Sequence, residues 1–220
     1  LISPILANVY LHYVLDLWFE KCIKKQLYGE AYLVRFADDF LIMFQYERDA
    51  QRVYEAVIKR MELFGLELSK EKTRILPFGR HSVSRETFDF LGFTHFNSKT
   101  RKGYYTVGHK ISRKKKKKFK SNLKKWVKEN RNTQFDEFMK TLNKKLTGSV
   151  NYYSLSGMIK EVRNLWIHSL YVTFKWLNRR SQRKSFKLEK FYEIWNDRII
   201  RPYIHVDIWS GDKVIYNKNV

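Results

Sequence analysis

The sequence predicts an α+β fold, in which antiparallel strands and helices alternate in the first half and helices alone form the second half. Three observations support this: strand-forming residues flank an aspartate pair near residue 38, apolar residues at helical spacing follow, and strand signals fade from Ser112 onward. The chain has 220 residues, 44% of them hydrophobic, which is enough for a core in one or two domains.

The first half predicts a sheet covered by helices. Residues 4–25 are largely apolar and predict a helix with Pro4 in its first turn, where a missing N–H costs little. Residues 50–64 have apolar side chains at helical spacing. Residues 74–77 and 87–90 favour further short strands. Together these elements predict an antiparallel sheet backed by helices.

The second half is helical and strongly basic. Residues 114–130, 135–146 and 158–178 predict three helices. Residues 1–100 carry 14 Lys and Arg against 13 Asp and Glu, whereas residues 101–220 carry 30 against 9. Such a field attracts polyanions, above all nucleic acid. A basic helix on a membrane surface is the alternative, but there is no signal peptide or long uncharged apolar run, so we expect a soluble protein that does not bind a membrane.

Asp38 and Asp39 stand between two apolar, strand-forming runs, residues 31–35 and 40–44. This pattern predicts a hairpin that presents both carboxylates at its bend. Hard oxygen ligands of this kind suit Mg²⁺ and favour two-metal phosphoryl or nucleotidyl transfer. The pair alone is weak evidence for catalysis, because Asp is a common turn former and most such pairs merely close hairpins.

Four sequence blocks occur in order along the first half: residues 2–11 (ISPILANVYL), 33–40 (LVRFADDF), 66–73 (LELSKEKT) and 90–93 (FLGF). Their order and spacing resemble the second half of the palm of group II intron reverse transcriptases, also called maturases. Residues 142–153 (LNKKLTGSVNYY) are similar to the signature of that family's thumb, or X domain.

The chain departs from the family pattern at two positions. The family more often has Tyr where Phe36 stands, a change that keeps an aromatic surface. It more often has Trp where Ser149 stands, which bears on packing within the thumb.

The resemblance implies a partial polymerase palm in residues 1–108 and a helical thumb, or maturase X domain, in residues 109–220. It implies an RNA-directed DNA polymerase that also assists RNA splicing. The fingers and the first palm strand, which carries a third metal-binding Asp, have no counterpart in these residues. We therefore expect a fragment that is inactive alone and pairs with a missing N-terminal half. The alternative is an RNA-binding maturase module without polymerase activity.

The resemblance also assigns roles near the aspartates. Asp38 and Asp39 are expected to be catalytic and to bind Mg²⁺, with Mn²⁺ as an alternative metal. Other residues are expected near the template or the incoming dNTP: Ser3, Pro4, Phe36 and Ala37. Without the resemblance, Ser3 and Pro4 simply begin a helix. Either Lys70 or Lys72, with Lys72 favoured, is expected to neutralise phosphate or protonate pyrophosphate; otherwise both are solvated charges.

Three further segments are predicted to bind nucleic acid. Leu91, Gly92 and Phe93 resemble the primer grip, although the same residues suit a simple strand bend. A cationic run opens the first helix of the second half and would grip phosphates, unless it is merely a solvated face: Arg113, Lys114, Lys115, Lys116, Lys117 and Lys118. Arg179 and Arg180, with Arg183 and Lys184, form a second cluster at a helix end, where cations also complement the helix dipole.

The expected partners are intron RNA, an RNA template with a DNA primer, and dNTP. Tyr152 and Tyr153 are candidates for stacking on bases, although adjacent tyrosines more often pack within the fold. The single cysteine, Cys22, is expected to be a buried apolar residue. The expected location is the bacterial cytoplasm or an organelle, without secretion.

Overall fold

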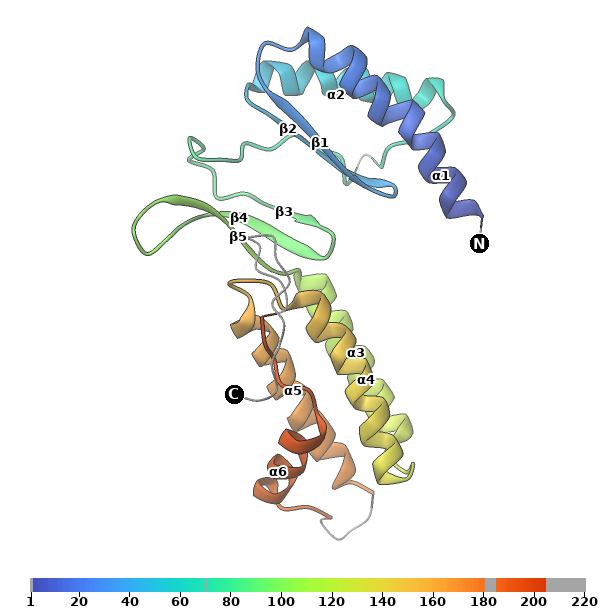
Figure 1. The fold of residues 1–220 in the computed structure, drawn as a ribbon, viewed down its shortest axis with the longest axis vertical. Helices are drawn as coiled ribbons and strands as arrows, with labels where there is room; N and C mark the ends of the chain where they lie inside the picture. The colour runs from blue at the N-terminus through green and yellow to red at the C-terminus, as the bar shows by residue number, and fades with distance from the viewer. Residues whose placement is uncertain (1, 70, 181–184, 205–220) are drawn as a thin grey trace. The chain divides into compact units, whose positions relative to one another are not determined.

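The computed structural model describes residues 2–69, 71–180 and 185–204, and it confirms the α+β class. The chain divides into two compact units (Figure 1). Unit 1 contains residues 1–91 and 96–107, and unit 2 contains residues 92–95 and 108–220.

Unit 1 begins with one continuous helical segment. Helix α1 (Ser3–Leu11) leads into two π-helical stretches, η1 (His12–Asp16) and η2 (Phe19–Ile23), and a last 3₁₀ turn, η3 (Lys24–Gln26). The predicted helix at residues 4–25 is confirmed in extent, but its π-helical turns were not predicted. The expectation for Cys22 was wrong, because its side chain is exposed.

The core of unit 1 lies between this helical segment, a hairpin and helix α2 (Figure 1). Strands β1 (Ala31–Phe36) and β2 (Asp39–Phe44) pair antiparallel, and α2 (Glu47–Leu63) follows. Gly65, at φ +67°, ends α2 in a Schellman motif: its N–H donates to the Glu62 carbonyl at 3.0 Å and the Leu66 N–H to the Met61 carbonyl at 2.9 Å. The fully buried side chains are Val14, Leu15, Phe19, Ala31, Val53, Val57 and Met61.

A second sheet has the order β3 (Thr87–Phe90), β4 (Phe93–Lys99) and β5 (Tyr105–Ile111). The predicted strand at residues 87–90 is confirmed, but the one at residues 74–77 was wrong. Pro77 has no N–H for a ladder, and the Arg74 side chain instead donates to the Thr87 carbonyl at 2.8 Å. The described strands therefore form two small sheets rather than one layer, and β4 and β5 were not predicted.

Unit 2 is built mainly from α3 (Arg113–Asn130), α4 (Phe135–Tyr153), α5 (Ile159–Leu177) and α6 (Leu188–Arg198) (Figure 1). The three predicted helices are confirmed, although α4 runs past residue 146 and α6 was not predicted. Their apolar faces meet in one core that includes Phe138, Leu142, Phe191 and Trp195. Within the described ranges, no helix has the length and apolar character needed to cross a bilayer.

Candidate active site and nucleic-acid interface

The aspartate pair lies at the bend of the β1–β2 hairpin, as predicted from its flanking residues. Phe36 pairs with Asp39 across the two strands, so Ala37 and Asp38 form the two-residue turn. Both aspartates are exposed, and so is the aromatic ring of Phe36. The turn therefore presents two carboxylates to solvent beside an open aromatic surface.

Ala37 adopts a backbone conformation that is unusual for a residue with a side chain. Its φ is +54°, in the left-handed region, where a non-glycine residue pays roughly 1–2 kcal/mol. A positive φ in a two-residue hairpin turn matches the twist of the strands. Such strain persists only where surrounding contacts hold it.

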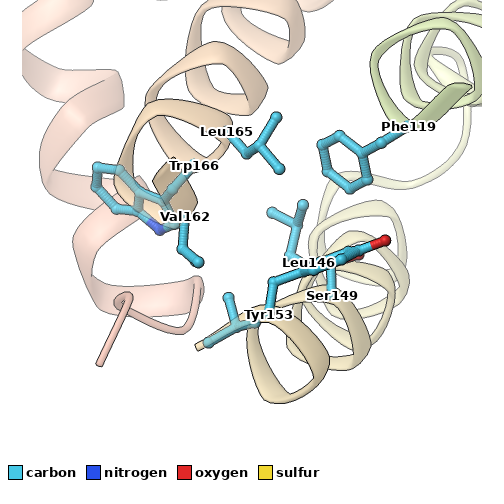
Figure 2. A pocket seen from close by; sticks show the side chains of 8 residues that line it. Phe119, Leu146, Ser149, Tyr153, Val162, Leu165 and Trp166 are labelled. Carbon is cyan, nitrogen blue, oxygen red and sulfur yellow. The ribbon is translucent and has the colours of Figure 1, made fainter. Parts of the chain in front are cut away.

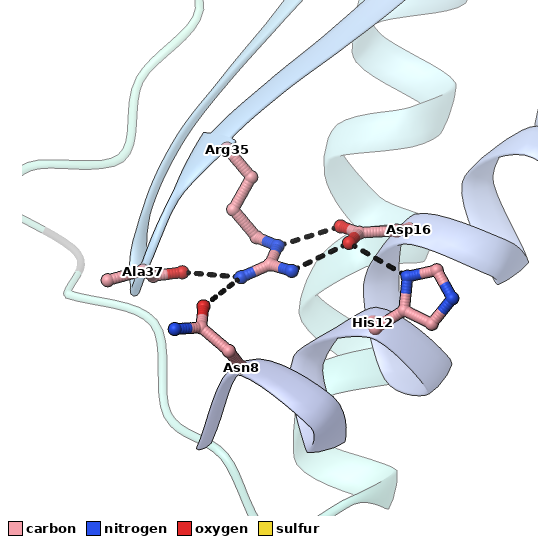
Figure 3. A network of polar contacts seen from close by, with 5 residues as sticks. All are labelled: Asn8, His12, Asp16, Arg35 and Ala37. Carbon is pink, nitrogen blue, oxygen red and sulfur yellow. Dashed lines mark hydrogen bonds and ion pairs between the residues drawn. The ribbon is translucent and has the colours of Figure 1, made fainter. Parts of the chain in front are cut away.

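Arg35 supplies those contacts (Figure 3). Its Nη1 donates to the Ala37 carbonyl and to Asn8 Oδ1, both at 2.9 Å. Its Nε and Nη2 donate to the two carboxylate oxygens of Asp16 at 2.8 and 2.6 Å. One guanidinium thus ties the strained turn to α1 through Asn8 and to η1 through Asp16.

The Arg35–Asp16 pair is electrostatically well matched. Hydrogen bonding from Arg35 holds the pKa of Asp16 below its usual value, and the same bond raises the pKa of Arg35. His12 Nδ1 lies 3.3 Å from the second Asp16 oxygen (Figure 3). The Arg35 side chain is only 13% exposed, so its pairing is shielded from competing water.

Ser3 and Pro4 occupy the first turn of α1, and both are exposed. The helix start is confirmed, but Ser3 is not its N-cap; that position is Ile2, which makes no side-chain capping bond. No residue of α1 is buried, and its side chains border an open apolar groove beside Ser3 that includes Leu6, Val9 and Tyr13.

Lys72 lies in an exposed turn that is fixed by Ser69. The Lys72 and Thr73 N–H groups donate to the Ser69 carbonyl at 3.0 and 2.9 Å. Within the described part of the chain, no hydrogen bond or ion pair joins Lys72 to the aspartate pair. Lys70 lies outside the described residues.

The donor set at the hairpin turn fits a hydrated Mg²⁺. Exposed carboxylates leave room for the waters and substrate phosphates that complete an octahedral shell. Within residues 2–69, 71–180 and 185–204, no three His, Cys, Asp or Glu side chains gather closely enough to hold a metal by themselves. Asp38 and Asp39 are therefore the residues of unit 1 that would hold the ion together with other ligands.

A second candidate region begins at the β3–β4 turn. Leu91 and Gly92 take φ values of +50° and +84°, the paired left-handed conformation of a tight hairpin. The Gly92 carbonyl accepts a hydrogen bond from the Ser112 N–H at 3.0 Å. A Cβ at Gly92 would lie 3.6 Å from Tyr153 Oη and from Lys115 Cγ, so Gly92 packs against the start of α3 and the end of α4.

Phe93 joins an aromatic group at the end of α4. Its ring stacks on Tyr152 with centroids 5.6 Å apart, and it meets Tyr153 edge-on at 5.5 Å. Burial raises the pKa of the Tyr153 hydroxyl, whereas Tyr152 is half exposed. Tyr153 thus packs within the fold, and Tyr152 keeps surface available to a partner.

The cationic run of α3 divides into two kinds of side chain. Lys116 forms an ion pair with Glu161 of α5 and is partly covered. The remaining cations of the run are exposed: Arg113, Lys114, Lys115, Lys117 and Lys118. The run is therefore an ordered helix face rather than a tail, and one of its lysines is engaged inside unit 2.

Ser149 borders a small apolar hollow between α3, α4 and α5 (Figure 2). The other walls are apolar or aromatic: Phe119, Leu146, Val150, Tyr153, Val162, Leu165 and Trp166. The Ser149 hydroxyl donates only to the Lys145 carbonyl one turn earlier, at 3.4 Å. A small residue at this position leaves the hollow open.

Arg179 and Arg180 follow the end of α5 and differ in their surroundings. Arg183 and Lys184 of the predicted cluster lie outside the described residues. The Arg179 guanidinium lies 5.4 Å from the centre of the Trp176 ring. Two nitrogens of Arg180, Nε and Nη2, are buried and have no hydrogen-bond partner among the described residues. That burial lowers the pKa of Arg180.

Sequence reasoning missed the partners of Arg35. Asn8 and Asp16 lie 27 and 19 residues from Arg35 along the chain. The available signal was Asp16 itself, a charged residue between the apolar runs Tyr13–Leu15 and Leu17–Phe19. A carboxylate in such a setting needs a partner.

Comparison with protein families gives two matches. Residues 1–95 match the family described as reverse transcriptase (RNA-dependent DNA polymerase). Residues 116–193 match the group II intron, maturase-specific domain. The first match covers the hairpin turn, and the second covers most of α3 and all of α4 and α5. A search of curated proteins gives no match. The chain belongs to the group II intron reverse transcriptases, or maturases.

Proposed function

We propose that this chain is the catalytic-palm and thumb portion of an RNA-directed DNA polymerase that also binds and helps to splice its intron RNA. The observation that carries the proposal is the Asp38–Asp39 turn, exposed at the end of a hairpin in a region that matches reverse transcriptases. Exposed paired carboxylates are the ligands that two-metal nucleotidyl transfer requires.

Asp38 and Asp39 would hold divalent cations, with Mg²⁺ as the first choice and Mn²⁺ as an alternative. When bound, such ions activate the primer hydroxyl and stabilise the leaving pyrophosphate. We further propose that a third carboxylate comes from a segment outside these 220 residues. Ser3, Pro4, Phe36 and Ala37 would border the incoming dNTP, and Lys72 would neutralise its phosphates or protonate pyrophosphate.

The β3–β4 turn and unit 2 would position the nucleic acid. Leu91, Gly92 and Phe93 would hold the primer terminus, and the exposed lysines of α3 would contact phosphates. Convergence of Gly92, Phe93, Lys115 and Tyr152 within unit 2 supports this assignment, because these residues come from three separate segments of the sequence.

Primer extension tests the polymerase function. The chain is combined with the N-terminal half of a complete enzyme, and DNA synthesis on an RNA template is measured with Mg²⁺. Asp38→Asn and Asp39→Asn should fold normally, by circular dichroism, but nearly abolish extension. The chain alone should give none. Extension by both variants at the parental rate would exclude the assignment.

A maturase without polymerase activity is the second candidate. The match of residues 116–193 to the maturase-specific domain, together with the positive charge of unit 2, favours it. In that case RNA binding and intron splicing would survive in Asp39→Asn, and the reconstituted parental protein would not extend primers.

A further inference from the structure

Three cations surround one indole ring in unit 2. Lys128 Nζ, Arg131 Cζ and Arg179 Cζ lie 5.8, 5.6 and 5.4 Å from the centre of the Trp176 ring. Lys128 is in the last turn of α3 and Arg131 is its C-cap, whereas Trp176 and Arg179 lie at the end of α5. We call these four residues the Trp176 cluster.

In the described part of the chain, no carboxylate forms an ion pair with a cation of the cluster, Lys128, Arg131 or Arg179. Their distances to a common ring place any two of them within about 12 Å, whereas the screening length at physiological salt is about 8 Å. Salt therefore weakens the repulsion among them but does not remove it.

Local interactions only partly offset this repulsion. An exposed cation–π contact contributes about 0.5–1 kcal/mol, and a cation at a helix C-terminus gains about 0.3–1 kcal/mol. A multivalent anion would neutralise Lys128, Arg131 and Arg179 together.

We propose that the Trp176 cluster is a second RNA-binding site of unit 2, which contacts the phosphates of intron RNA. Guanidinium groups match phosphate oxygens with paired hydrogen bonds, and a half-buried indole beside them offers a flat surface to a base or ribose. This inference rests on the proposed RNA-binding function, and it adds a location.

The site is distinct from the lysine run at the start of α3. Lys115 and Lys128 are thirteen residues apart on one straight helix, which corresponds to about 20 Å at 1.5 Å per residue. A structured RNA that spans both ends of α3 would contact both sites.

Salt-dependent RNA binding tests the inference. Binding of the 220-residue chain to a structured intron RNA is measured by fluorescence anisotropy over a range of salt concentrations. The Arg131→Gln/Arg179→Gln variant should bind several-fold more weakly, and its log K against log salt should be less steep by roughly 0.7–0.9 for each phosphate that is no longer neutralised. Trp176→Leu should also weaken binding although the charge is unchanged. Thermal melting identifies variants that fail to fold. If Trp176→Leu fails to fold, the Arg131→Gln/Arg179→Gln variant still tests the site.

The matched control removes two exposed cations elsewhere in unit 2, in Lys140→Gln/Lys190→Gln. It should change the salt slope less than the arginine pair does. If the slope of log K against log salt were the same for the Arg131→Gln/Arg179→Gln variant and the parent, the proposal of a second site would be overturned. Polyglutamate binding is measured in the same way as a comparison. If the Arg131→Gln/Arg179→Gln variant lost polyglutamate binding but bound RNA as the parent does, the second RNA-binding site would also be overturned, in favour of a site for an acidic polypeptide. Failure of the parental chain to bind RNA at all would instead contradict the proposed function.

Discussion

The Arg35 guanidinium donates a hydrogen bond to the carbonyl of Ala37, 2.9 Å away, and so braces the backbone immediately before the two aspartates (Figure 3). The same guanidinium is held by both oxygens of Asp16. The left-handed Ala37, the Arg35 guanidinium and the partly exposed Asp16 carboxylate thus form one hydrogen-bonded group behind the proposed catalytic carboxylates.

Loss of this brace should slow primer extension. In a complete enzyme, we expect Arg35→Gln to reduce the rate by roughly ten- to a hundredfold, because small misplacements of reacting groups are this costly. KM for dNTP should change little. Arg35→Lys should not rescue the rate, since an ammonium cannot bridge Asp16 and Ala37 with the fork of a guanidinium. Steady-state kinetics measure both quantities.

A fold control separates positioning from stability. Breaking a paired, charged hydrogen bond costs about 1–3 kcal/mol, so both variants should remain folded at low temperature. Their Mg²⁺ requirement should rise if the aspartates are displaced. Parental rates and Mg²⁺ dependence in Arg35→Gln would show that the turn holds its geometry without Arg35.

The Arg35–Asp16 pair should also make stability depend on pH. The folded-state pKa of Asp16 lies below its unfolded value, near 3.9. Its contribution is therefore complete above about pH 4 and is lost as the pH falls toward the folded-state pKa. Urea unfolding measures the difference in the free energy of unfolding between the parent and Asp16→Asn. This difference should be constant from pH 7 to 5 and should shrink below pH 4. A difference that grows on acidification would contradict the pairing.

Ser149 offers a test of packing in unit 2. We expect Ser149→Trp to overfill the hollow against Phe119 and Trp166, which has room for about one water molecule, and to destabilise the fold by about 1–3 kcal/mol. For a chain of this size, each 1 kcal/mol lowers Tm by about 2–4 °C. Ser149→Ala is the matched control and should be nearly neutral. A Tm for Ser149→Trp at or above the parental value would mean that the walls of the hollow move apart to accept an indole.

Local patterns explain what the sequence could predict. The β1–β2 hairpin depends on neighbouring residues, an aspartate turn between strand formers, and it was predicted closely. Ile75 and Leu76 in the segment at residues 74–77 also favour a strand, but Pro77 removes a ladder donor and the segment is not a strand. Pro77 was thus the signal in the sequence that distinguishes these two cases.

Contacts between distant segments were not predictable. Asp16 and Arg35 meet across 19 residues, and the Trp176 cluster joins α3 to α5, because tertiary packing decides which helix faces meet. Periodicity identifies the apolar face of each helix but not its partner. The resemblance to a family supplied roles for single residues, whereas the contacts of Arg35 that hold the aspartate turn could be found only in the three-dimensional structure.

The lysines of α3 provide the last prediction, because the structure separates one of them from the others. Lys114→Gln/Lys118→Gln should weaken RNA binding and make log K less steep in log salt by roughly 0.7–0.9 for each phosphate that these lysines no longer neutralise. Lys116→Gln should leave that slope nearly unchanged, since Lys116 is paired with Glu161, and should instead lower Tm slightly. Anisotropy titrations and thermal melts measure both effects. A slope change per charge as large in Lys116→Gln as in the double variant would show that RNA displaces Glu161 from this lysine.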